Sequence, residues 1–110
     1  MIKIINDNKE QNFILLFLEK NITEKNLTKS SVNSYENDLI GFYSFLEKNN
    51  FTVLECTYDI IVMWIETLKK SSFEQSTLSR KISTIRQFFN FLFVEKFMII
   101  NPMTNIISPK

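Results

Sequence analysis

The chain has 110 residues, of which 45% are hydrophobic, and its formal net charge is +1. This length suits a single domain with a modest core, and one glycine and two prolines are too few for the frequent turns of an all-β fold. The apolar content, which includes eleven phenylalanines, also argues against a disordered chain. The composition therefore predicts an all-α fold.

Composition also limits the chemistry that the chain can perform. It contains no histidine and one cysteine, so the common zinc ligand sets and nucleophile–base pairs cannot be assembled. We therefore expect no catalytic residue, no metal site and no cofactor. No apolar run approaches the roughly 20 residues of a membrane-spanning helix, and a lone cysteine suits a reducing compartment. These features favour a cytoplasmic protein without a membrane partner.

The net charge conceals an uneven distribution along the chain. Residues 1–68 carry six lysines against ten acidic residues, whereas residues 69–110 carry seven lysines and arginines against two glutamates. Such asymmetry is typical of a surface that binds nucleic acid or another polyanion. Two charge clusters that neutralise each other on a small bundle would give the same numbers, and on charge alone this simpler interpretation is favoured.

Hydrophobic periodicity predicts four helices and a short fifth helical turn. The second helix begins near Thr28 or Ser30, either of which is a suitable N-cap, and the third is capped by Thr57. Pro102 opens the short fifth turn. The four helices are expected at about residues 8–21, 28–50, 57–70 and 75–96.

The fourth predicted helix divides most clearly into faces. A core stripe, spaced by three and four residues, consists of Leu78, Ile82, Ile85, Phe89 and Leu92. The opposite face is expected to carry Arg80, Ser83, Thr84 and Gln87, with Lys81 and Arg86 on its flanks. From Phe88 onward the helix is apolar nearly all round, so this half is expected to be buried or to lie in an interface.

The polar row of this helix has the donors of a DNA-facing surface. Guanidinium groups bind phosphate or guanine with two hydrogen bonds, and hydroxyl and amide groups reach phosphates or base edges. A solvated face that keeps the bundle soluble is the alternative. No acidic residue occurs in residues 76–94, whereas a merely solvated face usually mixes both signs of charge. This absence favours the DNA-binding interpretation.

Two other groups of residues have less specific patterns. Tyr35 and Trp64 could form a stacking platform for single-stranded nucleic acid, but both lie in apolar stripes, so core packing is expected. Glu36 and Asp38 are expected on an ordinary helix surface.

Three stretches together resemble a known family. Residues 27–39 contain a Thr/Ser-x-x-x-Tyr-x-x-Asp-Leu pattern, and residues 78–89 contain Ser-Arg-Lys-Ile-Ser-Thr-Ile-Arg-Gln-Phe-Phe. Asn101-Pro102, followed by Ser108-Pro109-Lys110, completes the series. In this order the stretches resemble the N-terminal core-binding domain of tyrosine recombinases, the phage integrase family, and look closest to its Xer-type members.

The resemblance implies a SAM-like bundle of four to five helices that forms half of a C-shaped clamp on double-stranded DNA. Residues 1–107 would be the core-binding domain, and residues 108–110 would begin the linker to an absent catalytic domain. Arg80, Ser83 and Arg86 match positions that face DNA, and Ser31 matches a hydroxyl at the start of the second helix. The first helix and the apolar end of the fourth would contact neighbouring recombinase protomers in a tetramer on DNA.

The chain departs from the pattern of this family in two respects. Many relatives have a basic pair after the tyrosine, where this chain has Glu36-Asn37, so weaker DNA contact by the second helix is expected. The Arg, Lys, His and Tyr set that cuts and rejoins strands through a phosphotyrosine belongs to the absent domain, so this fragment would only bind. The alternative hypothesis is a helical protein–protein interaction module that does not bind DNA.

Overall fold

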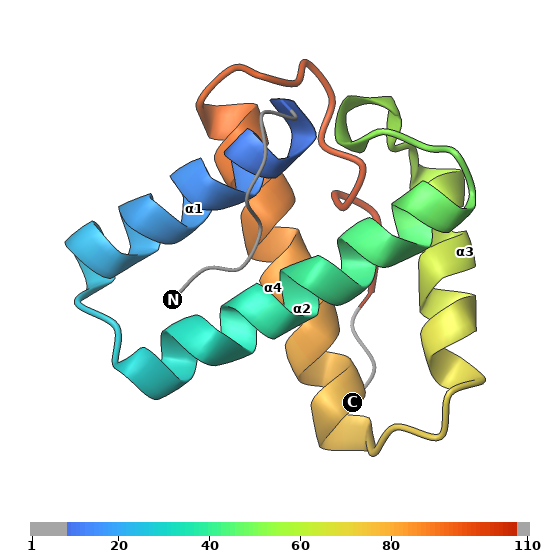
Figure 1. The fold of residues 1–110 in the computed structure, drawn as a ribbon. Coiled ribbons are helices and arrows are strands. Elements are labelled where there is room, and N and C mark those ends of the chain that lie inside the picture. Colours follow the sequence, from blue (N-terminus) through green and yellow to red (C-terminus); the bar gives the residue numbers. More distant parts are fainter. Residues whose placement is uncertain (1–8, 108–110) are drawn as a thin grey trace.

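The computed structural model describes residues 9–107, and within this range it contains four α-helices and no strand. The helices are α1 (Lys9–Lys25), α2 (Lys29–Lys48), α3 (Tyr58–Lys69) and α4 (Gln75–Val94), with a short 3-10 turn, η1 (Val53–Glu55), before α3. Helices α1 and α2 form a V, and α2 crosses α4, which packs against all three other helices (Figure 1). The predicted all-α bundle is therefore confirmed.

Two threonines fix the starts of the middle helices. The Thr28 hydroxyl accepts a hydrogen bond from the Ser31 backbone N–H at 3.1 Å, and the Thr57 hydroxyl accepts one from the Ile60 N–H at 3.3 Å. Each bond satisfies a backbone donor that has no partner within the helix. Thr28, rather than Ser30, is therefore the cap of α2.

Helix α1 continues beyond the residue at which we expected it to end. Asn21 does not break the helix, because its side-chain amide donates to the Phe17 carbonyl at 2.8 Å and is buried against the preceding turn. The helix ends only at Lys25, where Asn26 follows in a left-handed conformation (φ 49°). Asparagine adopts this conformation more easily than most residues.

Helices α2 and α4 end in the same motif, although neither has a glycine there. In α4 the Phe97 N–H donates to the Leu92 carbonyl and the Lys96 N–H donates to the Phe93 carbonyl. This is the Schellman pattern, in which the residue after the C-cap is left-handed; here Lys96 has φ 67°. The turn ends α4 at Val94, two residues before the expected Lys96. Asn50 (φ 60°) has the equivalent position after α2.

Aromatic side chains hold the helices together. Phe42 of α2 packs edge-on against Trp64 of α3 and Phe89 of α4, with ring centroids 5.0 and 5.7 Å apart. Phe17 of α1 packs on Phe88 of α4 in the same way, at 5.5 Å. Edge-to-face pairs of this kind contribute beyond the apolar area that they bury. The phenylalanines therefore join all four helices into one core.

The structure bears on three expectations about apolar residues. Trp64 is buried and Tyr35 is half-buried against the core, so core packing is confirmed for both. The apolar half of α4 is buried except at Phe93 and the following Val94, which are about half exposed. Pro102 opens a turn over residues 102–105 rather than a fifth helix, and Met103 and Ile106 of this segment are buried. The expected linker at residues 108–110 lies outside the described residues.

We expect Lys96→Gly to stabilise the domain by about 0.5–1 kcal/mol, because a left-handed backbone strains any residue with a Cβ and glycine lacks one. Chemical denaturation of the variant and the wild type measures the change. Asn50→Gly is the matched control and should gain less, because asparagine tolerates the same conformation. Equal or lower stability of Lys96→Gly would contradict this explanation.

The cap of η1 should make stability depend on pH. The Thr52 backbone N–H donates to Glu55 Oε1 at 2.9 Å, and hydrogen bonding by Thr52 lowers the pKa of Glu55 below its ordinary value. A carboxyl with a lowered folded-state pKa contributes stability above its unfolded-state pKa and loses it as the pH falls through the folded-state value. Glu55→Gln should therefore destabilise the domain more at neutral pH than at pH about 3. Urea titrations at both pH values test this, and an equal loss at both would contradict it.

Candidate nucleic-acid interface

The exposed side of α4 carries a polar stripe of side chains spaced by four and three residues. At this spacing they share one face of a helix. Helix α4 contains no acidic residue, so this face carries positive charge and neutral hydrogen-bonding groups only. The stripe consists of Ser76, Arg80, Ser83, Gln87 and Asn90. Neither Ser76 nor Asn90 was predicted from the sequence, although each lies seven residues from Ser83, and this spacing was available as a signal.

A buried carboxylate joins this helix to α2. The Asp38 side chain has no exposed surface, and each of its oxygens accepts two hydrogen bonds from α4. Oδ1 accepts from Arg80 Nη2 at 2.7 Å and from Lys81 Nζ at 3.2 Å. Oδ2 accepts from Arg80 Nε at 3.2 Å and from the Thr84 hydroxyl at 2.9 Å. We call these four residues the Asp38 cluster.

The Asp38 cluster corrects two expectations. Thr84 does not line the exposed face, because its side chain is buried and bound to Asp38. Glu36 and Asp38 are not surface residues, since both are buried. Asp38 lies three residues after Tyr35 and four before Phe42, and Thr84 lies four before Phe88. Both residues therefore occupy apolar stripes, which was the available signal.

The two basic residues of the Asp38 cluster differ in accessibility. The Arg80 side chain is 47% exposed, and its hydrogen bonds to Asp38 raise the pKa of its guanidinium above the ordinary value. The Lys81 side chain is only 16% exposed, and its ammonium also lies over the Phe73 ring, 5.1 Å from the centroid. Arg80 is therefore the member that a ligand can reach directly.

Gln87 is a second point at which helices meet. Its Oε1 accepts from Lys25 Nζ of α1 at 3.2 Å and lies 3.3 Å from the Tyr35 hydroxyl of α2, which donates to it. Its Nε2 donates to the Ser83 hydroxyl at 3.4 Å. Lys25 is thus brought beside the α4 stripe, although it is 62 residues away in sequence. Nothing in the sequence pattern indicated this placement.

Arg86 lies at the edge of the stripe and binds the C-terminal segment. Its Nη1 donates to the Met103 carbonyl at 3.3 Å, while the Met103 N–H donates to the Asn101 side chain at 2.9 Å. Arg86 is partly buried, in contrast to the more open Arg80. One function of Arg86 is therefore to hold the turn at residues 101–104 against α4.

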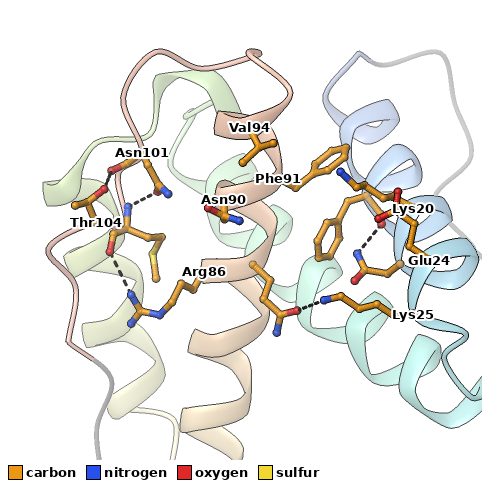
Figure 2. A pocket seen from close by; sticks show the side chains of 13 residues that line it. Lys20, Glu24, Lys25, Arg86, Asn90, Phe91, Val94, Asn101 and Thr104 are labelled. Atoms are coloured by element: carbon orange, nitrogen blue, oxygen red, sulfur yellow. Dashed lines mark hydrogen bonds between the residues drawn. The ribbon is translucent and has the colours of Figure 1, made fainter.

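A pocket of about 510 Å³ opens between α1, α4 and this turn (Figure 2). Phe17 and Phe91 are among the residues that line it, and Glu24 is the acidic side chain in the lining. Three basic residues line it, namely Lys20, Lys25 and Arg86. Lys20 is paired with Glu95 at 3.0 Å, and this hydrogen bond raises the pKa of Lys20. The pocket therefore continues the basic side of α4 towards α1.

Ser31, the remaining predicted site residue, lies in the first turn of α2. Its backbone N–H and its hydroxyl both lie about 3.1 Å from the Thr28 hydroxyl, so it is part of the helix cap. The side chain is partly exposed. The helix dipole favours anions at such a position.

Two general findings accompany the site. Among the described residues, no group of three or more His, Cys, Asp or Glu side chains could hold a metal ion. In the same range of the chain, no helix is long and apolar enough to span a bilayer.

The sequence matches the family described as "Phage integrase, N-terminal SAM-like domain" over residues 14–96. The chain belongs to this family. The resemblance to Xer-like tyrosine recombinases and the expected SAM-like fold are thereby confirmed.

Several curated proteins are similar to the chain. "Tyrosine recombinase XerD" of Rickettsia bellii is 40% identical over 98 residues, which cover 89% of this chain and 32% of that protein. "Tyrosine recombinase XerC" of Listeria monocytogenes is 34% identical over 86% of this chain and 32% of its own length. "Tyrosine recombinase XerC" of Staphylococcus epidermidis is 32% identical over 79% of this chain and 29% of its own length. The chain thus spans about a third of these relatives. No solved structure gives a significant match.

We expect Thr84→Val to destabilise this SAM-like domain by about 2 kcal/mol, because valine keeps the shape but removes a buried hydrogen bond to a carboxylate. Thermal or urea denaturation measures the loss. Ser83→Ala, which removes an exposed hydroxyl one residue away, is the matched control and should change stability by less than about 0.5 kcal/mol. Equal effects of the two substitutions would contradict the burial and bonding of Thr84.

Proposed function

We propose that the chain is the core-binding domain of a site-specific tyrosine recombinase and that it grips one half-site of duplex DNA. The observation that carries the proposal is the acid-free polar stripe of α4, flanked by basic side chains, in a chain whose relatives are named tyrosine recombinases. Phosphate contacts dominate DNA affinity, and they require cationic and hydroxyl donors on one surface.

In this proposal α4 faces the DNA and its side chains have different roles. Arg80 binds phosphate or a base edge directly, because it is the cation of the stripe and its side chain is 47% exposed. Ser83 and Gln87 supply register through hydrogen bonds, and Arg86 adds charge from the edge. Lys81 contributes charge from its partly buried position, and Thr84 acts by supporting Asp38 rather than by contact.

Further contacts are proposed from α1 and α2. Lys25 lies beside Gln87 and extends the basic surface, and Ser31 brings the start of α2 to a phosphate. Glu36 is buried and Asn37 is uncharged, so these two positions of α2 add no positive charge to the surface.

The wider activity follows from the relatives and is likewise a proposal. The complete protein would cut and rejoin DNA strands through a phosphotyrosine intermediate formed in a second, catalytic domain. This domain would then act by binding and by positioning its half of the clamp, within a tetramer of protomers on DNA. The reaction needs no metal ion from this domain.

Removal of both arginines tests the DNA-facing role of α4. If Arg80 and Arg86 each contact one phosphate, Arg80→Ala/Arg86→Ala should make the slope of log K against log salt concentration shallower by about 2. Fluorescence anisotropy with a labelled duplex at several salt concentrations measures the slope.

The matched control is Lys69→Ala/Lys70→Ala, which removes the same charge from the end of α3, outside the stripe. Its slope should stay close to that of the wild type. An unchanged slope for the arginine variant would sink the proposed contact, and equal changes in both variants would indicate only nonspecific charge.

A second function is favoured by the apolar side chains exposed near the end of α4. Phe93, Phe97 and Ile100 are 45%, 42% and 75% exposed, and Ile99 is 93% exposed. Exposed apolar groups at this density are typical of protein contacts. They suit the contact with a neighbouring protomer, or a protein-interaction module that does not bind DNA. Coding sequence downstream of Lys110 with an Arg…His-x-x-Arg…Tyr pattern would favour the recombinase.

A further inference from the structure

We infer that Asp38 is a positioning residue for DNA binding, which holds the Arg80 guanidinium so that its outer edge is presented to the nucleic acid. This inference rests on the proposed function of α4. It starts from the buried Asp38 carboxylate, whose oxygens accept hydrogen bonds from Arg80, Lys81 and Thr84 of α4. Of these three side chains, Arg80 is about half exposed.

The hydrogen bonds between Asp38 and Arg80 define the orientation of the guanidinium. Arg80 uses Nε and Nη2, so the carboxylate meets the guanidinium along its side. A guanidinium has five N–H donors, and the pair on its outer edge, from Nη1 and Nη2, stays available. That edge matches two adjacent acceptors, such as the oxygens of a phosphate or O6 and N7 of guanine.

Lys81 and Thr84 fix the carboxylate itself. Lys81 donates to one oxygen and Thr84 to the other, so Asp38 cannot rotate without losing bonds on both sides. Arg80 is thereby held in one orientation before DNA arrives. A side chain that is already ordered loses less rotamer entropy on binding, which increases affinity.

Charge alone makes the opposite prediction, which allows a clear test. The Asp38 cluster contains two cations and one anion. Removal of the anion makes the surface more positive and therefore more complementary to the negatively charged phosphates. Asp38→Asn would then tighten DNA binding. If Asp38 positions Arg80, the same change weakens binding, because an amide nitrogen cannot accept the bonds that one carboxylate oxygen accepts.

The experiment measures binding of the 110-residue chain to a labelled duplex at one fixed salt concentration. We expect Asp38→Asn to bind roughly fivefold more weakly than the wild type. Glu47→Gln, which removes one exposed negative charge from the same helix, is the charge control and should bind as well as the wild type or slightly better. In an Arg80→Ala background, Asp38→Asn should change the affinity by less than about twofold.

Arg80→Lys keeps the charge and leaves Asp38 intact, so it tests the inference even if Asp38→Asn does not fold. Lysine has one ammonium for both Asp38 and DNA, and we expect this variant to bind within about twofold of Arg80→Ala. In the free wild-type domain, the Arg80 Nε–H should give a slowly exchanging NMR signal.

The possible outcomes separate the inference from the proposed function. If the wild type binds DNA but Asp38→Asn binds equally or more tightly, or Arg80→Lys keeps the wild-type affinity, the positioning role is overturned and the proposed function stands. A rapidly exchanging Arg80 Nε–H in the wild type also overturns it. Absence of salt-dependent binding by the folded wild-type chain overturns both.

Discussion

The placement of every outward-facing group on α4 depends on one buried carboxylate. Removing a charge from water is costly unless the charge is paired and its lone pairs are satisfied. Asp38 meets this condition only when Arg80, Lys81 and Thr84 all point towards α2. Because these residues span little more than one helical turn, satisfying Asp38 fixes both the rotation and the height of α4 against α2. The orientation of the remaining stripe follows from this.

The aromatic core and the Asp38 cluster make different contributions to the packing of the helices. Phe42 and Phe89 bring α2, α3 and α4 together, but aromatic packing tolerates small rotations, since rings attract over a range of angles. Hydrogen bonds to a carboxylate are short and directional and specify one arrangement. The core therefore supplies most of the attraction between helices, and Asp38 selects among the ways in which they could pack.

Much of the fold could be predicted because it depends on local rules. Thr28 and Thr57 cap helices through their own hydroxyls, and the core stripe of α4 follows from the helical repeat. The site was only partly predictable. Arg80 and Ser83 were correctly expected to be exposed, but the burial of Thr84 depends on an acceptor 46 residues earlier in the chain. Such a partner is determined by how two helices cross, and periodicity within one helix cannot specify it.

The turn after α4 extends the core beyond the last helix. Met103 and Ile106 complete the core, and the Met103 carbonyl is an acceptor for Arg86. A fragment that stops at Asn101 would keep every helix and still leave a hole beside α4 and an arginine without this acceptor. The core of the described residues therefore extends to Ile106, twelve residues beyond the last helix. A boundary drawn from helices alone would cut through the core.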